Sequence, residues 1–198
     1  MMQVTEIITE KKKLLIHTDS GLCFPLYQKE AAQYQICEGS RITDELWAQI
    51  RREVLDLRAK KRAMYLLEKM DRTEAQLRRK LQENHYPEEV VTCAMDYVRS
   101  FHYIDDYRYA AAFIRSRQGA KSRIQLKMSL LQKGVPADLI EQALEDECSE
   151  EEEVLIRKLL EKKKYDPEQM DQQQKYKIYQ SILRKGFSGS IVRNAMGL

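Results

Sequence analysis

Residues 101–144 have the sequence FHYIDDYRYAAAFIRSRQGAKSRIQLKMSLLQKGVPADLIEQAL, and this stretch decides the fold. Its pattern predicts three short helices joined by tight breaks. Gly119 ends the first helix, because glycine tolerates the left-handed conformation found at helix ends. The second helix is predicted at about 121–133, where Gly134 stops it. Pro136 then opens the third helix, at a position that needs no N–H donor.

The same unit occurs twice more in the chain. ENHYPEEVVTCAM (83–95), QKGVPADLIEQAL (132–144) and RKGFSGSIVRNAM (184–196) align at offsets of 49 and 52 residues. The equivalent apolar positions are Leu81, Leu130 and Ile182; Val91, Ile140 and Val192; Ala94, Ala143 and Ala195; and Met95, Leu144 and Met196. The repetition predicts a mainly α protein, in which tandem three-helix repeats form an elongated, curved array.

The N-terminal part has a different pattern. Apolar runs separated by turn residues over 3–27 predict a small antiparallel β-meander. Thr43 is expected to cap a helix that buries Leu46 or Trp47, Ile50, Val54 and Leu57, and this helix either runs on into the first repeat or bends there. We therefore predict a β-containing segment with a helix at 1–57. The three repeats are predicted at 58–101, 102–148 and 149–198, with Ser149 and Glu150 opening the first helix of the last one.

The middle helix of the second repeat carries two apolar stripes. Leu126 and Leu130 form one stripe, and Ile124, Met128 and Leu131 form the other. A helix with two apolar sides is expected to have neighbours on both. We therefore predict that this helix packs within its own repeat and also against an adjacent repeat.

Charges are separated along the chain, although the formal net charge is only +3. Residues 107–137 contain seven basic residues and no acid, whereas residues 138–156 contain nine acids and no base. This separation predicts a polarised surface with a basic patch. Arginine forks in such a patch suit carboxylates or phosphates. The predicted partner-binding residues are Arg115, Arg117, Lys121, Arg123 and Lys127.

Motifs for catalysis or metal binding are absent from the sequence. It has no glycine-rich phosphate loop, no G-x-S-x-G and no CxxC, and its four cysteines stand far apart. Asp105 and Asp106 form an acidic pair, but capping the following helix is favoured over a metal or acid–base role. We predict no enzyme activity, no metal and no cofactor. Without a leader or an apolar run of about 18 residues, a cytoplasmic protein with no membrane contact is expected.

The central stretch resembles the RecX family of bacterial regulators of the RecA recombinase. The resemblance rests on Tyr103-Ile104-Asp105-Asp106, Arg108-Tyr109-Ala110 and Lys133-Gly134-Val135. The first repeat departs from this pattern, since Asn84-His85 replaces Lys133-Gly134. Some family members carry a similar short β-containing N-terminal segment. The motif residues interpreted as structural are Asp105, Asp106, Arg108, Tyr109, Ala110, Lys133 and Gly134.

The resemblance implies a non-enzymatic regulator that acts in DNA repair, homologous recombination and the SOS response. Such a protein, expected as a monomer, binds the RecA filament on single-stranded DNA and limits its ATP hydrolysis and strand exchange. The basic patch would then contact RecA or DNA phosphates. The alternative is a helical repeat protein that binds DNA non-specifically without RecA, with an affinity that falls steeply with salt.

Overall fold

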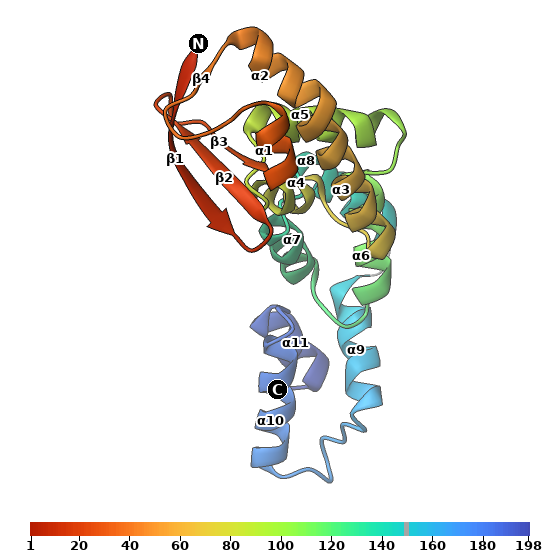
Figure 1. The fold of residues 1–198 in the computed structure, drawn as a ribbon. Helices are drawn as coiled ribbons and strands as arrows, with labels where there is room; N and C mark the ends of the chain where they lie inside the picture. The colour runs from red at the N-terminus through yellow and green to blue at the C-terminus, as the bar shows by residue number, and fades with distance from the viewer. Residues whose placement is uncertain (149–150) are drawn as a thin grey trace. The chain divides into compact units, whose positions relative to one another are not determined.

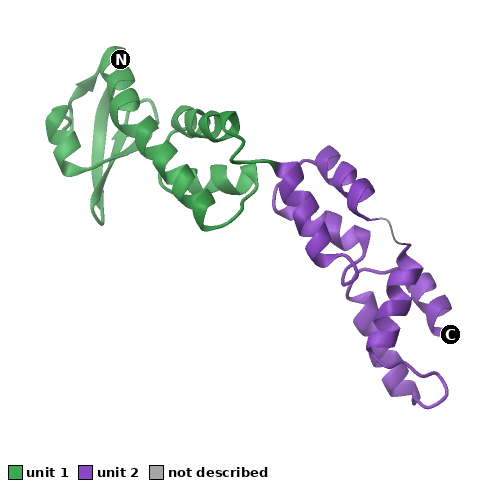
Figure 2. Cartoon of the chain, turned by 90° about the vertical axis from the view of Figure 1, so that its right-hand side faces the viewer, with its two compact units in different colours: residues 1–105 green, residues 106–198 purple. Residues whose placement is uncertain are grey.

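The computed structural model describes residues 1–148 and 151–198 and is mainly helical (Figure 1). Two compact units divide the chain, residues 1–105 and residues 106–198 (Figure 2). The mainly α fold built from tandem three-helix repeats is as the sequence predicts. The predicted helix start at Ser149 and Glu150 lies outside the described residues. In the described part of the chain, no helix combines the length and apolarity needed to cross a bilayer.

The N-terminal sheet has four strands. β1 (Met2–Glu10), β2 (Lys13–Thr18), β3 (Cys23–Leu26) and β4 (Arg41–Ile42) pair antiparallel in the order β3-β2-β1-β4. The first three are the predicted meander. The fourth was not predicted, because two residues are too few to show an alternating pattern. Pro25 lies on β3 at the edge of the sheet, where a missing N–H breaks no ladder.

A long helical run leads from the sheet into the first repeat. It follows the short helix α1 (Gln28–Gln33) and consists of α2 (Asp44–Ile50), a π-helical segment η1 (Arg51–Leu55) and α3 (Asp56–Lys69). The Thr43 hydroxyl accepts a 3.2 Å hydrogen bond from the N–H of Leu46, so the predicted cap is confirmed. Of the two alternatives, the helix runs on past Leu57, with one wider turn inserted at η1. The predicted burial of Leu57 is wrong: its side chain is 52% exposed, because it lies on the side of α3 opposite the buried Ala59.

One core joins the sheet to the first repeat. The remaining helices of this unit are α4 (Glu74–Gln82), capped by Thr73, and α5 (Glu88–Ser100). Buried side chains from Val4 to Ile104 form a single apolar cluster. The division at residue 57 stays a prediction, although this core spans it. Within the core, burial raises the pKa of the Tyr86 phenol to about 12.

The second unit contains six helices in its described residues. They are α6 (Asp106–Arg117), α7 (Arg123–Gln132), α8 (Ala137–Glu147), α9 (Glu152–Lys162), α10 (Gln172–Leu183) and α11 (Gly189–Met196). The first three share one buried cluster and the last three share another. The positions aligned in the sequence occupy these cores. Leu130, Ile140, Ile182 and Val192 are fully buried, as are Leu81 and Val91 in the first unit.

The turn between the second and third helix has the same backbone in all three repeats. His85, Gly134 and Gly186 take positive φ angles of 63°, 82° and 85°. His85 therefore adopts the left-handed conformation that glycine adopts in the other copies. The departure from the family pattern at Asn84-His85 changes the residue at this position but not the turn.

The second and third repeats contact each other within the second unit. The N–H of Ser122 donates a 2.9 Å hydrogen bond to the carbonyl of Lys185, and Gln125 Nε2 donates to the carbonyl of Arg184 at 3.1 Å. The Lys185 ammonium donates in return to the carbonyl of Ala120. A Cβ atom on Gly186 would lie 2.6 Å from Ser122 Oγ. This contact therefore depends on glycine for its space as well as for its φ angle.

Replacing Tyr86 by Phe is expected to reduce the loss of stability at alkaline pH. The phenol of Tyr86 has a pKa of about 10 in the unfolded chain, whereas burial in the folded protein raises this pKa to about 12. The contribution of Tyr86 to the free energy of unfolding is therefore complete below about pH 10, and it is lost as the pH rises toward about 12. Urea unfolding at pH 8 and pH 11, followed by Trp47 fluorescence, measures this. Equal pH dependence in the two proteins would contradict the assignment.

Replacing Gly186 by Ala is expected to destabilise the second unit more than replacing Gly119 by Ala. Both glycines have φ near 80°, but a Cβ on Gly119 meets nothing within 4 Å. Gly119→Ala should cost about 1 kcal/mol from backbone strain alone, and Gly186→Ala about 2–3 kcal/mol because Ser122 must also move. Urea unfolding followed by far-UV circular dichroism compares the two. Equal losses would show that the Ser122 contact adds nothing.

Candidate partner-binding surface

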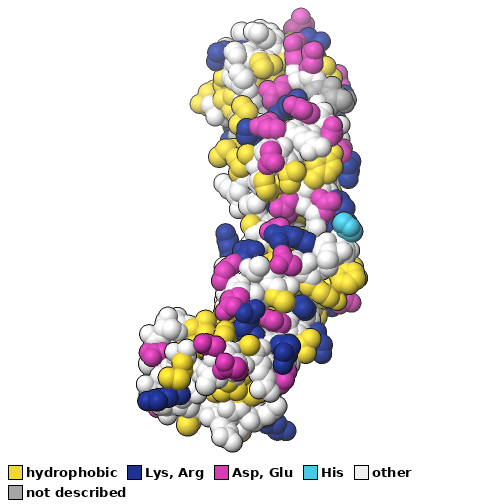
Figure 3. Space-filling model, turned by 90° about the horizontal axis from the view of Figure 1, so that it is seen from above, with side chains coloured by type: hydrophobic (Ala, Val, Ile, Leu, Met, Phe, Trp, Pro, Cys, Tyr) yellow, Lys and Arg dark blue, Asp and Glu magenta, His cyan; other side chains and the backbone are white. Residues whose placement is uncertain are grey.

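The predicted basic patch is partly neutralised by the acidic segment that follows it. Arg115 on α6 forms an ion pair with Glu147 on α8, and Lys127 on α7 forms one with Glu141 on α8. The packing of α8 against α6 and α7 brings the two segments together. The predicted separation of charge into two surfaces is therefore wrong for Arg115 and Lys127. On the face shown in Figure 3, basic, acidic and hydrophobic side chains are interspersed.

Arg117 is held by its own helix. Its guanidinium lies 4.1 Å from the centroid of the Phe113 ring, and Nη1 donates a 3.0 Å hydrogen bond to the Ser116 hydroxyl. Lys133 approaches the same ring at 5.6 Å. These cation–π contacts fix both charges at the end of α6. Arg117 stays exposed, so it can still add positive charge to the surface around it.

Lys121 and Arg123 lie at the N-terminus of α7, together with Lys158 from α9. The three cations line a pocket of about 290 Å³, whose apolar wall includes Leu126 and Leu155. Lys121 and Arg123 form no ion pair with a described carboxylate. Lys121 and Arg123 therefore leave positive charge at this pocket that an anionic group can neutralise. Lys158 was missed from the sequence because it lies in the next repeat, beyond the basic run.

The position of these cations is electrostatically unfavourable for the helix itself. The N-terminus of a helix carries partial positive charge, so acidic residues are favoured there and basic residues are not. The first turn of α7 contains no acid, and its Ser122 cap accepts from the N–H of Gln125 at 3.2 Å. Basic residues at the positive end of a well-capped helix reduce its stability, and such a local conflict is typical of a binding surface.

The Cys148 thiol also lines this pocket but is not activated. Burial raises its pKa, and the nearby Arg123 opposes the rise with a smaller effect. A reactive thiol requires the reverse balance. All four cysteines are free, and no group of three or more His, Cys, Asp or Glu within 1–148 and 151–198 is arranged to hold a metal ion.

The second apolar stripe of α7 is exposed. The helix does contact an adjacent repeat, as predicted, but it does so through Ser122 and Gln125 rather than through this stripe. Leu126 and Leu130 are buried in the repeat core, but Ile124, Met128 and Leu131 are 66%, 53% and 39% exposed. The amphipathic pattern identified both stripes, but it could not tell which one lacks a neighbour within its unit. Three large apolar side chains on one helix face, beside Lys121 and Arg123, form an exposed patch and a candidate contact surface. These five residues are called the α7 surface below.

The residues of the family motif mostly build the second repeat. Ala110 is fully buried, and the Tyr109 ring lies 6.5 Å from that of Phe113. Gly134 supplies the left-handed turn, and Asp106 is the first residue of α6. Arg108 is exposed, and both Arg108 and Asp105 interact with other groups of the protein. The structural interpretation of the motif stays a prediction.

The fold defines a class: a tandem three-helix repeat protein. Family models identify the class further. Residues 59–97 match the first, residues 105–144 the second and residues 150–196 the third three-helix domain of RecX. The chain belongs to the RecX family.

Relatives of known name agree with this assignment. The regulatory protein RecX of Clostridium perfringens (strain SM101 / Type A) is 28% identical, over 98% of this chain and 96% of the relative. That of Limosilactobacillus reuteri (strain DSM 20016) is also 28% identical, over 96% of this chain and 74% of the relative.

Two solved structures share the fold. A crystal structure of regulatory protein RecX has a TM-score of 0.62 and 26% identity, covering 100% of this chain and 99% of that one. The structure of RecX from Lactobacillus salivarius, at 23% identity and a TM-score of 0.56, covers 72% of this chain and 95% of that one, and it supports the fold alone.

Proposed function

We propose that this chain is a monomeric, non-enzymatic regulator in the cytoplasm that binds the RecA filament on single-stranded DNA and lowers its ATPase and recombinase activity. Membership of a family whose relatives are named regulatory proteins supports a regulatory role. The α7 surface carries the proposal. Its Ile124, Met128 and Leu131 are exposed in their unit, and binding to a partner protein would cover them.

The cations beside this stripe fit a filament of protein and DNA. Lys121 and Arg123 can meet acidic side chains of a protein or phosphates of a DNA strand. A repeated filament also presents the same contact on each subunit. A monomer that spans more than one subunit would gain affinity by avidity that free RecA does not offer.

Inhibition of RecA should persist when DNA is in large excess. The measurement is ATP hydrolysis by RecA on single-stranded DNA, with the chain added below the RecA concentration. A regulator of the filament lowers the rate under these conditions, since so little protein cannot mask the DNA. If excess DNA abolishes the effect, non-specific DNA binding explains it instead. No inhibition at any ratio would exclude the proposed function.

Changing the α7 surface should weaken inhibition at least about tenfold without unfolding the protein. The variants are Lys121→Glu with Arg123→Glu, and separately Ile124→Ser with Met128→Ser. Loss of two exposed contacts at a protein interface costs about 1.4 kcal/mol or more, which is a factor of ten. Arg115 and Lys127 are left unchanged because their substitution would also break ion pairs with α8.

The matched control replaces Lys162 and Lys163 by Glu, which makes the same charge change on exposed lysines of α9 and its cap. This control should inhibit like the native chain, and circular dichroism should show equal helicity in all variants. Inhibition that survives both sets of changes on α7 would exclude the α7 surface as the contact.

A further inference from the structure

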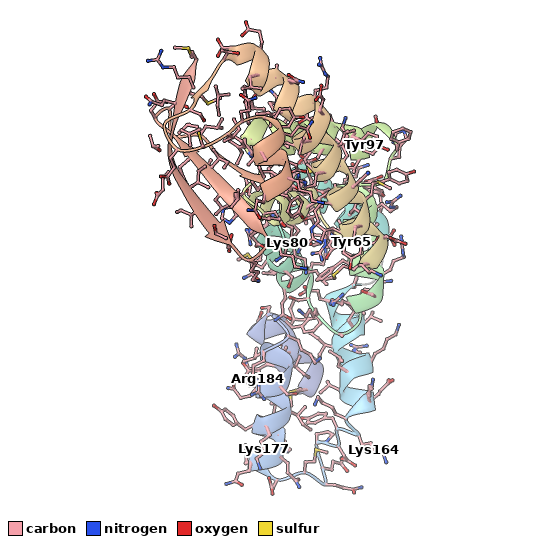
Figure 4. All side chains as sticks on the ribbon, in the orientation of Figure 1. Tyr65, Lys80, Tyr97, Lys164, Lys177 and Arg184 are labelled. Atoms are coloured by element: carbon pink, nitrogen blue, oxygen red, sulfur yellow. The ribbon has the colours of Figure 1, made fainter. Side chains whose placement is uncertain are left out.

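The first unit carries a second surface, in a groove between α3 and α5. The groove encloses about 590 Å³, and its lining includes Leu57, Met64 and Tyr65 of α3 and Tyr97 of α5. Figure 4 labels the two tyrosines on these helices. Leu57 and Tyr65 are 52% and 49% exposed. The groove therefore exposes apolar and aromatic side chains to solvent within its unit.

Aromatic rings continue from this groove along the end of α5. The ring centroids of Tyr97 and Phe101 are 5.0 Å apart, and those of Phe101 and Tyr103 are 5.8 Å apart with an angle of 23° between planes. Phe101 and Tyr103 are 55% and 46% exposed. Rings of this size are normally buried for the free energy of removing them from water. An exposed row of them marks a surface that binds another molecule.

Lysines surround these rings and lack carboxylate partners. Lys60 Nζ lies 5.4 Å from the Tyr97 centroid, and Lys69 Nζ lies 5.4 Å from that of Tyr65. Lys60, Lys61 and Lys69 form no ion pair with any described residue.

Four arginines of the unit, by contrast, are neutralised by carboxylates. Arginines on the neighbouring helices are paired in Arg51–Glu89, Arg58–Glu30, Arg78–Glu88 and Arg99–Glu74. Lys60, Lys61 and Lys69 therefore leave positive charge beside the exposed rings, and Glu68 is the one acid among the described residues that line the groove.

We propose that the α3–α5 groove binds single-stranded nucleic acid. Each nucleotide presents one flat base and one negative phosphate, and this surface places Lys60 and Lys69 each 5.4 Å from the centroid of an aromatic ring. Bases stack on exposed aromatic faces, while lysines bind the backbone without regard to sequence. An acidic peptide would satisfy the lysines, but it has no regular series of flat groups for the ring row. A duplex keeps its bases stacked inside and cannot use the rings.

This proposal stands apart from the proposed function, because direct binding of DNA needs no RecA. The test uses the full chain and a fluorescein-labelled oligothymidylate of 20 nucleotides, followed by fluorescence anisotropy over a range of salt concentrations. Tyr65→Ala and Phe101→Ala should each weaken binding at least about fivefold, the usual effect of losing one stacked base. Tyr65→Phe keeps the ring and should bind like the native chain.

Replacing the lysines of the groove should change how strongly binding of the oligonucleotide depends on salt. Lys60→Gln with Lys61→Gln removes two phosphate contacts, so the slope of log K against log salt should become shallower by about 1.4. The matched controls are Tyr176→Ala, on a tyrosine that is 63% exposed, and Lys162→Gln with Lys163→Gln. These controls should bind like the native chain. Trp47, the only tryptophan, reports whether the first unit remains folded.

Two further ligands separate stacking from simple charge attraction. A duplex and an abasic strand of the same length carry phosphates without accessible bases, so both should bind more weakly and respond little to Tyr65→Ala. Equal binding of the abasic strand, or native affinity in Tyr65→Ala and Phe101→Ala, would overturn the proposal. If those two variants keep DNA affinity but lose inhibition of RecA, the groove binds protein and the proposal is wrong.

Discussion

Each repeat depends on one residue that holds a left-handed backbone between its second and third helices. At His85, Gly134 and Gly186 the chain reverses, and hydrogen bonds from the N–H groups at 85, 134 and 186 return to carbonyls at 82, 131 and 183. The third helix can then place its apolar face back on the second. A right-handed residue at this point would continue the helix and separate Leu130 from Ile140, and with them the core of the repeat. Glycine takes this conformation without strain, whereas His85 holds it against a cost of about 1 kcal/mol.

The sequence predicted what depends on local patterns. The repeat alignment identified core positions such as Leu81, Leu130 and Ile182, because apolar spacing and turn residues are written into adjacent positions. Local patterns could not predict contacts between residues that are far apart in the sequence. Arg115 and Glu147 are 32 positions apart, and their ion pair follows from the return of α8 to α6 rather than from any local pattern. The strand β4, with two residues, gave no pattern at all.

The candidate site was predicted in part for the same reason. The basic run located Lys121 and Arg123 correctly at the start of a helix, but it could not show that Lys158 would join them or that Lys127 would be neutralised. Both surfaces described here contain features that stability alone does not explain. Cations stand at the positive end of α7, and aromatic rings stand in water along α5. Local conflicts of this kind are expected where a protein has been shaped for contact.

The two proposed surfaces lie in different units and are of different chemistry. The α7 surface is apolar with two cations, whereas the α3–α5 groove offers rings and lysines for a nucleic acid strand. A filament presents protein and single-stranded DNA together, while free RecA or free DNA presents only one of them. Once one unit is bound, the second binds intramolecularly, and the loss of translational freedom is not repeated. Two individually weak contacts on one chain would therefore favour the filament over either component. Because salt screens the lysines more than the apolar stripe, added salt should weaken the DNA contact first and leave the protein contact.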